Sequence, residues 1–453
     1  MGKATADAIV DLDPDEEERT PRSEAWLIFV ALLCTALVPS FSKTYGDFTP
    51  DPVFNQLLWS VLYLIAFVRI RTLVPNVRTL IAKSAWLWVF GLLMLISVLW
   101  SVNPFVTIKE SMEMIGTMII GAYIVARFPL RRFLNILSVV FGAIATLSLL
   151  LIFASPGRGR MDWGSGAWSG LFQEKNLLGA AMAFAIFSIG FSLPSARGKR
   201  RLRMLATLIL CILLLVGSNS VTAATDLAIV LLLAGAVLLC RSERYGATAR
   251  IVVAAAAAVA LVLYTMYGFD PNALFAMFGR SSTLTGRTDF WPFLYQAIGD
   301  RPLLGYGYDA FFTAPISVDY LSYYVVGSGG WTPYHAHNSF LQILLNAGYV
   351  GLALCIVQLL VGFRRSIMFI SRKDGQGGAE ALWPFAVLLY LVVGSYTESY
   401  LGGFNSMESV LFVAAYLYPV RSALIGSRNE SAADPTSSLE ARPYAYRQTT
   451  ARF

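Results

Sequence analysis

Long apolar stretches alternate with short polar turns along most of this 453-residue chain. Each stretch runs for about 17–25 residues, the length of a helix that crosses the hydrocarbon core of a bilayer. The pattern predicts twelve membrane helices, at residues 25–41, 53–70, 84–102, 111–127, 133–154, 176–193, 203–219, 224–240, 250–268, 338–362, 382–400 and 406–422. The sequence therefore predicts an all-α polytopic integral membrane protein.

The basic residues fall on alternate turns between these stretches. The turn after the fourth predicted helix carries Arg127, Arg131 and Arg132, and the turns after the second, sixth, eighth and tenth are similarly basic. The short turns at 217–222 and 401–405 contain no lysine or arginine. Because basic residues concentrate in cytoplasmic loops, we expect both termini in the cytoplasm and the longest loop, residues 269–337, on the other side.

Composition agrees with this interpretation and narrows the function. The chain is 56% hydrophobic and 14% charged, whereas a soluble domain carries about 25% charged residues. The net charge of +7 lies in turns beside membrane segments, so nucleic acid is not an expected partner. No nucleotide-binding glycine motif and no metal-ligand spacing is present, and we expect no cofactor and no metal. Polar tails at 1–24 and 423–453 are predicted to be disordered, which leaves 25–422 as the membrane domain.

The only two histidines, His335 and His337, lie where the long loop enters the tenth predicted helix. If that helix begins at His337, then Gly348 and Gly351 share its face to within about 40°. Two glycines on one face let a neighbouring helix approach closely. An imidazole held there can accept a proton from a hydroxyl or, when charged, bind a phosphate. The alternative is a histidine that caps the helix or anchors it at the interface.

A second candidate lies earlier in the long loop. An apolar stripe at helical spacing predicts a short helix over 288–299 that lies on the membrane; its members are Phe290, Trp291, Leu294, Ala297 and Ile298. Arg287 stands at its N-terminus, and a guanidinium binds phosphate oxygens in a bidentate manner. Arg280 allows the same interpretation. The alternative for both is a solvated loop arginine or an anchor for anionic headgroups.

A third cluster covers residues 158–176 and includes Arg158, Arg160, Lys175 and Asn176. Lys175 opens the sixth predicted helix on the non-cytoplasmic side, against the usual charge bias, so it either serves a purpose there or extends harmlessly to the interface. Carboxylates also occur within apolar stretches, where they suggest a functional role with a partner such as Lys109 or Lys175; they are Glu110, Glu113, Asp226, Glu398 and Glu408. Their spacing does not suggest a proton relay.

Taken together, these residues resemble the O-antigen ligase and polysaccharide polymerase superfamily of bacterial membrane glycosyltransferases. The family motif is matched by His337-Asn338, nine residues, Gly348, two residues and Gly351. The preceding family segment is matched by Arg287, Trp291, Pro302, Gly305, Gly307 and Phe311. Lys175-Asn176 resembles a motif of the exopolysaccharide-polymerase branch. The turn at 217–222 lacks the arginine that family members often carry, so Lys175, Arg158 or Arg160 replaces it, or Arg287 and hydroxyls hold the anion.

The resemblance implies a GT-C-like glycosyltransferase of the bacterial inner membrane with a periplasmic active site. It would join undecaprenyl-pyrophosphate-linked oligosaccharides into an exopolysaccharide by inverting transfer, with a flippase and a chain-length regulator as further partners. His337 would activate the acceptor hydroxyl or orient the pyrophosphate, and Arg287 would offset the charge of the leaving group. The implied substrate-binding residues are Lys175, Asn176, Arg280, Arg158, Arg160, His335, Asn338 and Tyr334. Aromatic residues that could stack on sugars, or belong to an interfacial belt, are Tyr323, Tyr324, Trp331 and Tyr334.

Two other functions remain open at this point. A ligase would transfer a finished glycan to lipid A–core or to another acceptor, and the Lys-Asn motif only favours the polymerase over it. A transporter of lipid-linked sugars would carry charged residues in a midplane cavity and inverted repeats, neither of which is evident in the sequence.

Overall fold

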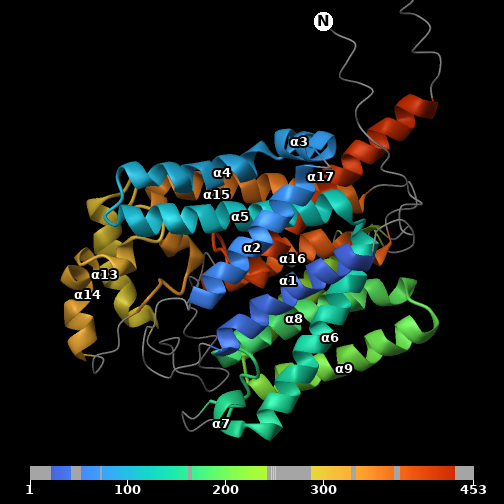
Figure 1. Cartoon of the computed structure of the whole chain (residues 1–453), viewed down its shortest axis with the longest axis horizontal. Helices are drawn as coiled ribbons and strands as arrows, with labels where there is room; N and C mark the ends of the chain where they lie inside the picture. Colours follow the sequence, from blue (N-terminus) through green and yellow to red (C-terminus); the bar gives the residue numbers. More distant parts are fainter. Residues whose placement is uncertain are drawn as a thin grey trace, which may run out of the picture.

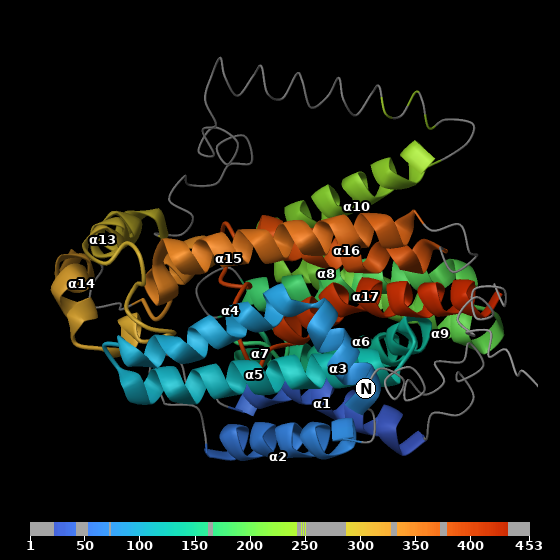
Figure 2. The same cartoon turned by 90° about the horizontal axis from the view of Figure 1, so that it is seen from above.

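The computed structural model describes residues 22–41, 53–71, 74–161, 166–241, 246, 248, 250, 287–327, 333–371 and 378–433. Within these ranges the side chains at 22, 37–41, 53–55, 74–76, 287–288, 323, 326–327 and 426–433 are not described. The described residues form a bundle of long helices, with two shorter helices, α13 and α14, at one end (Figures 1 and 2). The α-helices are α1 (Arg22–Phe41), α2 (Val53–Ile70), α3 (Val74–Lys83), α4 (Ala85–Ile96), α5 (Pro104–Arg127), α6 (Leu130–Ala154), α7 (Pro156–Gly159), α8 (Lys175–Ser192), α9 (Gly198–Ser218), α10 (Val221–Arg241), α13 (Arg287–Asp300), α14 (Ile316–Gly327), α15 (Ser339–Ile370), α16 (Trp383–Gly394) and α17 (Met407–Ala433).

The helical fold class is confirmed. Six described helices are long and apolar enough to cross a membrane, and a seventh span results if α3 and α4, bent by 84° at their junction, count as one. Three further apolar segments are shorter, namely Ser23–Ala36 in α1, Gln56–Ile70 in α2 and Ala379–Gly394, which ends in α16. Eleven of the twelve expected spans overlap described helices, and the ninth, 250–268, lies outside the described residues except at 250. A count of twelve therefore stays a prediction.

Exposed leucines, isoleucines and valines cover the outer faces of several helices. On α9 these include Leu202, Ile209 and Val216, and on α10 Leu232 and Leu239. A soluble monomer rarely exposes apolar patches of this extent. The inner faces are packed instead with fully buried side chains such as those of α6, α8, α16 and α17. The outward-facing apolar surface is what lipid tails would cover.

Basic side chains gather at the end of the bundle opposite α13 and α14. Glu24 forms ion pairs with Arg69 and Arg127. Arg131 lies 3.9 Å from Glu380, and Arg365 donates to the backbone oxygen of Lys83 at 2.6 Å. The alternate basic turns thus meet at one end, as expected for antiparallel spans.

The eleventh expected span is shorter than predicted. α16 ends at Gly394, so its 12 residues extend about 18 Å, less than the bilayer core. The chain from 395 to 406 leaves the helix and contacts Ser339 on α15. The Ser339 hydroxyl oxygen lies 2.8 Å from the Ser395 hydroxyl and 3.1 Å from the Glu398 backbone oxygen, with one proton to share between them, and it accepts from Leu401 N–H at 3.0 Å. The helix of the twelfth expected span is longer than predicted, because α17 continues to Ala433, past the expected end at 422.

α15 differs most from its predicted form. Its helix begins at Ser339, and it is interrupted at Ala347 and at Gly348, which has φ +60°. The expectation that His337, Gly348 and Gly351 share one helical face is therefore wrong. His337 precedes the helix, and the left-handed backbone at Gly348 resets the register.

The segment 302–307 fills the break in α15. Tyr349 N–H donates to Pro302 O at 2.7 Å, and Tyr306 N–H donates to Leu345 O at 2.7 Å. A Cβ at Gly348 would lie 2.3 Å from the carbonyl of Leu303. A residue with a side chain could neither adopt this φ without strain nor fit the space. Gly348 thus admits a loop, not the neighbouring helix that the sequence suggested.

α13 carries the apolar stripe expected for residues 288–299, but the stripe faces the protein. Phe290, Trp291, Leu294, Ala297 and Ile298 are all buried, and they form a second core with side chains of α14 and of the start of α15. Trp291 Nε1 also donates to Ala336 O at 3.0 Å. The expectation that this face lies on the membrane is therefore wrong, because protein side chains already cover it.

Candidate active site

Asn338 joins the start of α15 to the chain that follows α16. Its side-chain oxygen accepts from the N–H groups of Phe340 at 2.9 Å and Leu341 at 3.1 Å, which caps the helix. Its side-chain nitrogen donates to Tyr396 O at 3.2 Å. All of these bonds are made within the protein, so Asn338 positions the preceding residue, His337.

That residue, His337, is 5% exposed and has a left-handed backbone, with φ +49°. Such a conformation is uncommon for a residue with a side chain and persists only where surrounding contacts hold it. The ring lies edge-on to Phe290, with centroids 6.5 Å apart. His337 Nδ1 lies 3.7 Å from Glu398 Oε2, which makes a buried imidazole–carboxylate pair. A proton on Nδ1, on the side of the carboxylate, would leave Nε2 as a proton acceptor.

His335 lies beside His337, with ring centroids 3.8 Å apart. Its Nδ1 accepts a hydrogen bond from the backbone N–H of His337 at 3.0 Å, and the Ser399 hydroxyl lies 3.4 Å from the same nitrogen. A backbone N–H can only donate, so Nδ1 carries no proton. His335 is therefore a neutral imidazole with its proton on Nε2.

Glu398 is held in place from a third direction. Its Oε1 accepts from Asn176 Nδ2 at 3.3 Å, and Asn176 Oδ1 accepts from the Ser220 hydroxyl at 3.0 Å. Asn176 is the second residue of α8, and Ser220 lies in the turn before α10. The site thus unites four segments that are far apart in the chain, namely 175–176, 217–222, 333–338 and 395–406. The hydropathy pattern predicts all four on the same side of the membrane.

The sequence identified Glu398 only as one of five carboxylates in apolar stretches. It did not distinguish Glu398 as the partner of His337, because the two residues are 61 positions apart. A usable signal was present in the polar run from Ser395 to Ser399 at the end of an otherwise apolar span. Such a run is expensive in a membrane unless it lines a cavity or binds another segment.

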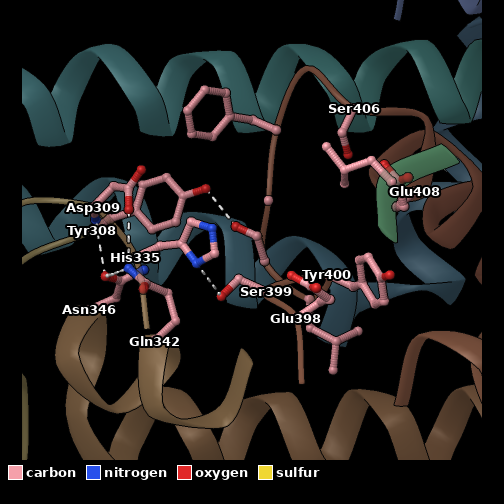
Figure 3. Close-up of a pocket in the computed structure, with 15 residues that line it drawn as sticks. Tyr308, Asp309, His335, Gln342, Asn346, Glu398, Ser399, Tyr400, Ser406 and Glu408 are labelled. Carbon is pink, nitrogen blue, oxygen red and sulfur yellow. Dashed lines mark hydrogen bonds between the residues drawn. The ribbon is translucent and has the colours of Figure 1, made fainter. Parts of the chain in front are cut away.

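A cavity of about 270 Å³ opens beside Glu398 and His335 (Figure 3). His335, Glu398 and Ser399 line one part of it, whereas His337 is not a lining residue. The other lining residues are Leu177, Tyr308, Asp309, Gln342, Asn346, Tyr400, Leu401, Gly402, Gly403, Phe404, Ser406 and Glu408. Burial raises the pKa of Tyr308 well above its usual range, so its hydroxyl stays protonated and donates to Gly402 O at 2.6 Å.

The cations expected at the site lie elsewhere or outside the description. Arg287 is the first residue of α13, as predicted, but its side chain lies outside the described residues, and so does all of Arg280. Lys175 is the first residue of α8, next to Asn176. Arg158 lies in α7, and the Arg160 guanidinium stacks on Phe153 at 5.7 Å. Among the described residues that line the cavity, none is Lys175, Arg158 or Arg160.

The aromatic candidates divide in the same way. Tyr334 is 41% exposed and lies edge-on to His335, with ring centroids 4.3 Å apart. Tyr324 packs against Phe290 at 5.6 Å and so belongs to the second core. Trp331 and the side chain of Tyr323 lie outside the described residues. Within the described ranges, no three histidine, cysteine or acidic side chains are grouped to hold a metal ion.

The sequence is similar to a known family and to a known protein. Residues 204–356 match the family model described as O-antigen ligase, a range that includes His335, His337 and Asn338. The chain is also 24% identical over 381 residues to the exopolysaccharide production protein ExoQ of Rhizobium meliloti (strain 1021). That alignment covers 82% of this chain and 83% of the relative.

These matches confirm the resemblance found in the sequence. The chain is a polytopic membrane protein that is similar over residues 204–356 to the O-antigen ligase family. The chain is also similar to a protein of exopolysaccharide production. The matches support a function of the ligase or polymerase type.

Proposed function

We propose that this protein polymerises an exopolysaccharide by joining oligosaccharide repeats linked to polyprenyl pyrophosphate, on the non-cytoplasmic side of the inner membrane. The observation that carries the proposal is the buried His337–Glu398 pair, 3.7 Å apart, at the edge of a polar cavity. A sugar hydroxyl needs a base of this kind to accept its proton as it attacks. The similarity to ExoQ over most of the chain supports the exopolysaccharide as product.

The reaction follows from the chemistry of the pair. The acceptor hydroxyl attacks the anomeric carbon of the donor sugar, and His337 Nε2 takes the hydroxyl proton. The bond between that carbon and the phosphate oxygen breaks, and polyprenyl pyrophosphate leaves with the electron pair. Attack opposite to the leaving group inverts the anomeric configuration. Glu398 stabilises the imidazolium that forms, as a buried carboxylate does in other histidine-dependent active sites.

Cations that lie outside the cavity have to balance the negative charge of the leaving pyrophosphate. Arg287, at the first position of α13, and Lys175, at the first position of α8, are the residues to which we assign this role. Both are at helix N-termini, where the helix dipole also favours an anion. Arg280, Arg158 and Arg160 remain candidate second cations. Fixed cations would make a bound metal unnecessary for the leaving group.

A ligase remains the second candidate, because the matching family model is described as O-antigen ligase. Its chemistry at the donor would be the same, and only the acceptor would differ. The Lys175-Asn176 motif favours the polymerase, since it resembles a motif of the exopolysaccharide-polymerase branch.

Purified protein in lipid nanodiscs should be given a defined polyprenyl-pyrophosphate-linked repeat, with no nucleotide and no ion gradient. The polymerase predicts a ladder of products that differ by one repeat. A single transfer to added lipid A–core, with no ladder, would instead indicate the ligase. Movement of the lipid-linked sugar across the bilayer without any new glycosidic bond would indicate a transporter.

A further inference from the structure

The cavity beside His335 carries carboxyl, amide and phenol groups but no cation. Its lining includes Asp309, Glu398 and Glu408, and no lysine or arginine occurs among the described residues that line it. His335 adds no charge, because its Nδ1 accepts a backbone N–H and the ring is neutral. Among the described lining residues, an anionic group would find no lysine or arginine and would lie close to carboxyl groups. This described lining suits a neutral ligand better than the pyrophosphate of a donor.

Amide groups prepare the cavity for a neutral polar ligand. Asn346 Oδ1 accepts from Asp309 N–H at 3.2 Å and from Gln342 Nε2 at 3.3 Å. Gln342 Nε2 also donates to Asp309 Oδ1 at 3.2 Å, and Gln342 Oε1 accepts from Ala336 N–H at 2.9 Å. These bonds fix the three side chains in one orientation. Within the described residues, the Asn346 Nδ2 amino group has no protein partner and remains available to a ligand.

Protein contacts hold the loop that carries Asp309. The N–H of the preceding residue, Tyr308, donates to the Ser97 hydroxyl at 2.9 Å. The aromatic rings of Tyr308, Tyr400 and Phe404 form further parts of the wall. Fixed polar groups between aromatic rings suit a sugar, which has both hydroxyls and an apolar face.

The size of the cavity limits how much sugar it holds. Small-molecule sites usually measure about 300–1,000 Å³, and this cavity measures about 270 Å³. It therefore suits one sugar ring and not a whole repeat. Glu398 both lines the cavity and pairs with His337, so a hydroxyl of that ring lies next to the proton-accepting pair.

From these observations we infer that the cavity binds the terminal sugar of the acceptor and selects an uncharged sugar over a uronic acid. The inference rests on the proposed function for its biological meaning. Binding of a sugar in the cavity can nevertheless be measured without glycosyl transfer, so the inference and the proposed function can fail separately. The donor pyrophosphate would occupy the other side of the histidines, toward α13.

The test uses the full-length protein in nanodiscs and pairs of methyl glycosides, each pair consisting of a neutral hexoside and its uronic-acid counterpart. Saturation-transfer NMR titrations give the dissociation constants. We expect at least one neutral hexoside to bind and its uronide to bind at least about tenfold more weakly. Equal or tighter binding of the uronides, or no binding of any neutral hexoside, would overturn the inference.

Two variants locate the binding. Asp309→Asn keeps a side-chain oxygen for Gln342 and replaces the carboxylate by an amide, so the ratio of the uronide to the neutral-hexoside dissociation constant should fall to about threefold. Asp300→Asn, at the exposed end of α13, is the matched control and should change neither constant. Asn346→Asp keeps the accepting oxygen and removes the free amino group, and it should weaken the neutral hexoside. If Asp309→Asn leaves the penalty intact, or Asp300→Asn also reduces it, the cavity is not the site.

Discussion

Glu398 is the residue through which the separate parts of the site are connected. It contacts His337 by one oxygen and Asn176 by the other, and it lines the cavity. Both His337 and Glu398 are less than 10% exposed. A buried carboxylate is stable there only if its partners offset the cost of removing it from water. The pairing with the His337 imidazole therefore best explains why Glu398 lies at this position.

Replacing Glu398 with Gln tests this role. The amide keeps an oxygen for Asn176 but loses the charge that stabilises an imidazolium, so kcat should fall by about 10²–10⁴ while the protein stays folded. The measurement is the initial rate of elongation by purified protein. Glu380→Gln removes a carboxylate at the opposite end of the bundle and is the matched control. Activity of the Glu398 variant within twofold of wild type would exclude the proposed pairing.

The two residues assigned from the family motif should be indispensable. His337→Ala removes the proton acceptor, and Arg287→Ala removes a cation for the leaving group, so each should abolish polymer in cells. Immunoblots of membrane fractions check that both proteins are still inserted. Arg132→Ala, at the basic end of the bundle, serves as the control for loss of an arginine and should make normal polymer. Wild-type polymer from both site variants would refute the assignment.

At the scale of elements, the broken helix α15 is the main structural device. Its first part carries the cap at Asn338 and the cavity residues Gln342 and Asn346, and its second part is a long apolar span. The loop 302–307 satisfies the backbone groups that the break exposes. Non-helical backbone is tolerated within a membrane protein only when protein groups satisfy it in this way. The break positions Asn346 to face Asp309.

Gly348→Ala should be disproportionately destabilising. The added methyl would face the carbonyl of Leu303 at 2.3 Å from a left-handed backbone, which costs about 2–4 kcal/mol. Gly190→Ala is the matched control, since its Cβ would meet nothing within 4 Å, and it should change stability by less than about 1 kcal/mol. Thermal unfolding of the detergent-solubilised proteins compares them. Similar melting temperatures for both variants would mean that the break in α15 is not required.

Sequence patterns identified which segments form the site, but they predicted the geometry of those segments less well. The His-Asn motif, the Lys-Asn motif and the loop glycines all prove to be structurally important, and α13 begins where predicted. The role of the glycines was misjudged because Gly348 in an apolar run looks like a residue for helix packing. Only its φ and the approach of Leu303 reveal a broken helix. Periodicity assumes a continuous helix and cannot detect such a break.

At the scale of the whole molecule, the two ends of the bundle differ in chemistry. One end carries ion pairs and basic turns, and the other carries the histidines, hydroxyls and amides of the site. Alternating turns predicted this division because the positive-inside bias acts on every span. The meeting of four distant loops was not predictable, since residues such as Asn176 and Glu398 are joined by tertiary packing alone.

The orientation in the membrane can be tested with single cysteines in a background lacking the native four. Gly299→Cys, on the exposed end of α13, should react with a membrane-impermeant maleimide added to intact spheroplasts. Lys199→Cys, on an exposed position at the start of α9, should react only after the membrane is opened. The reverse pattern would place the site in the cytoplasm and contradict the proposed reaction.

The most direct measurement follows both products of one reaction. Purified protein is given a lipid-linked repeat of known anomeric configuration, and the released polyprenyl pyrophosphate and new glycosidic bonds are quantified together by mass spectrometry and NMR. The account predicts one pyrophosphate lipid released for each new bond, with inversion at the anomeric carbon, and loss of both products in His337→Ala. New bonds with retained configuration, or formed without release of the pyrophosphate lipid, would contradict it.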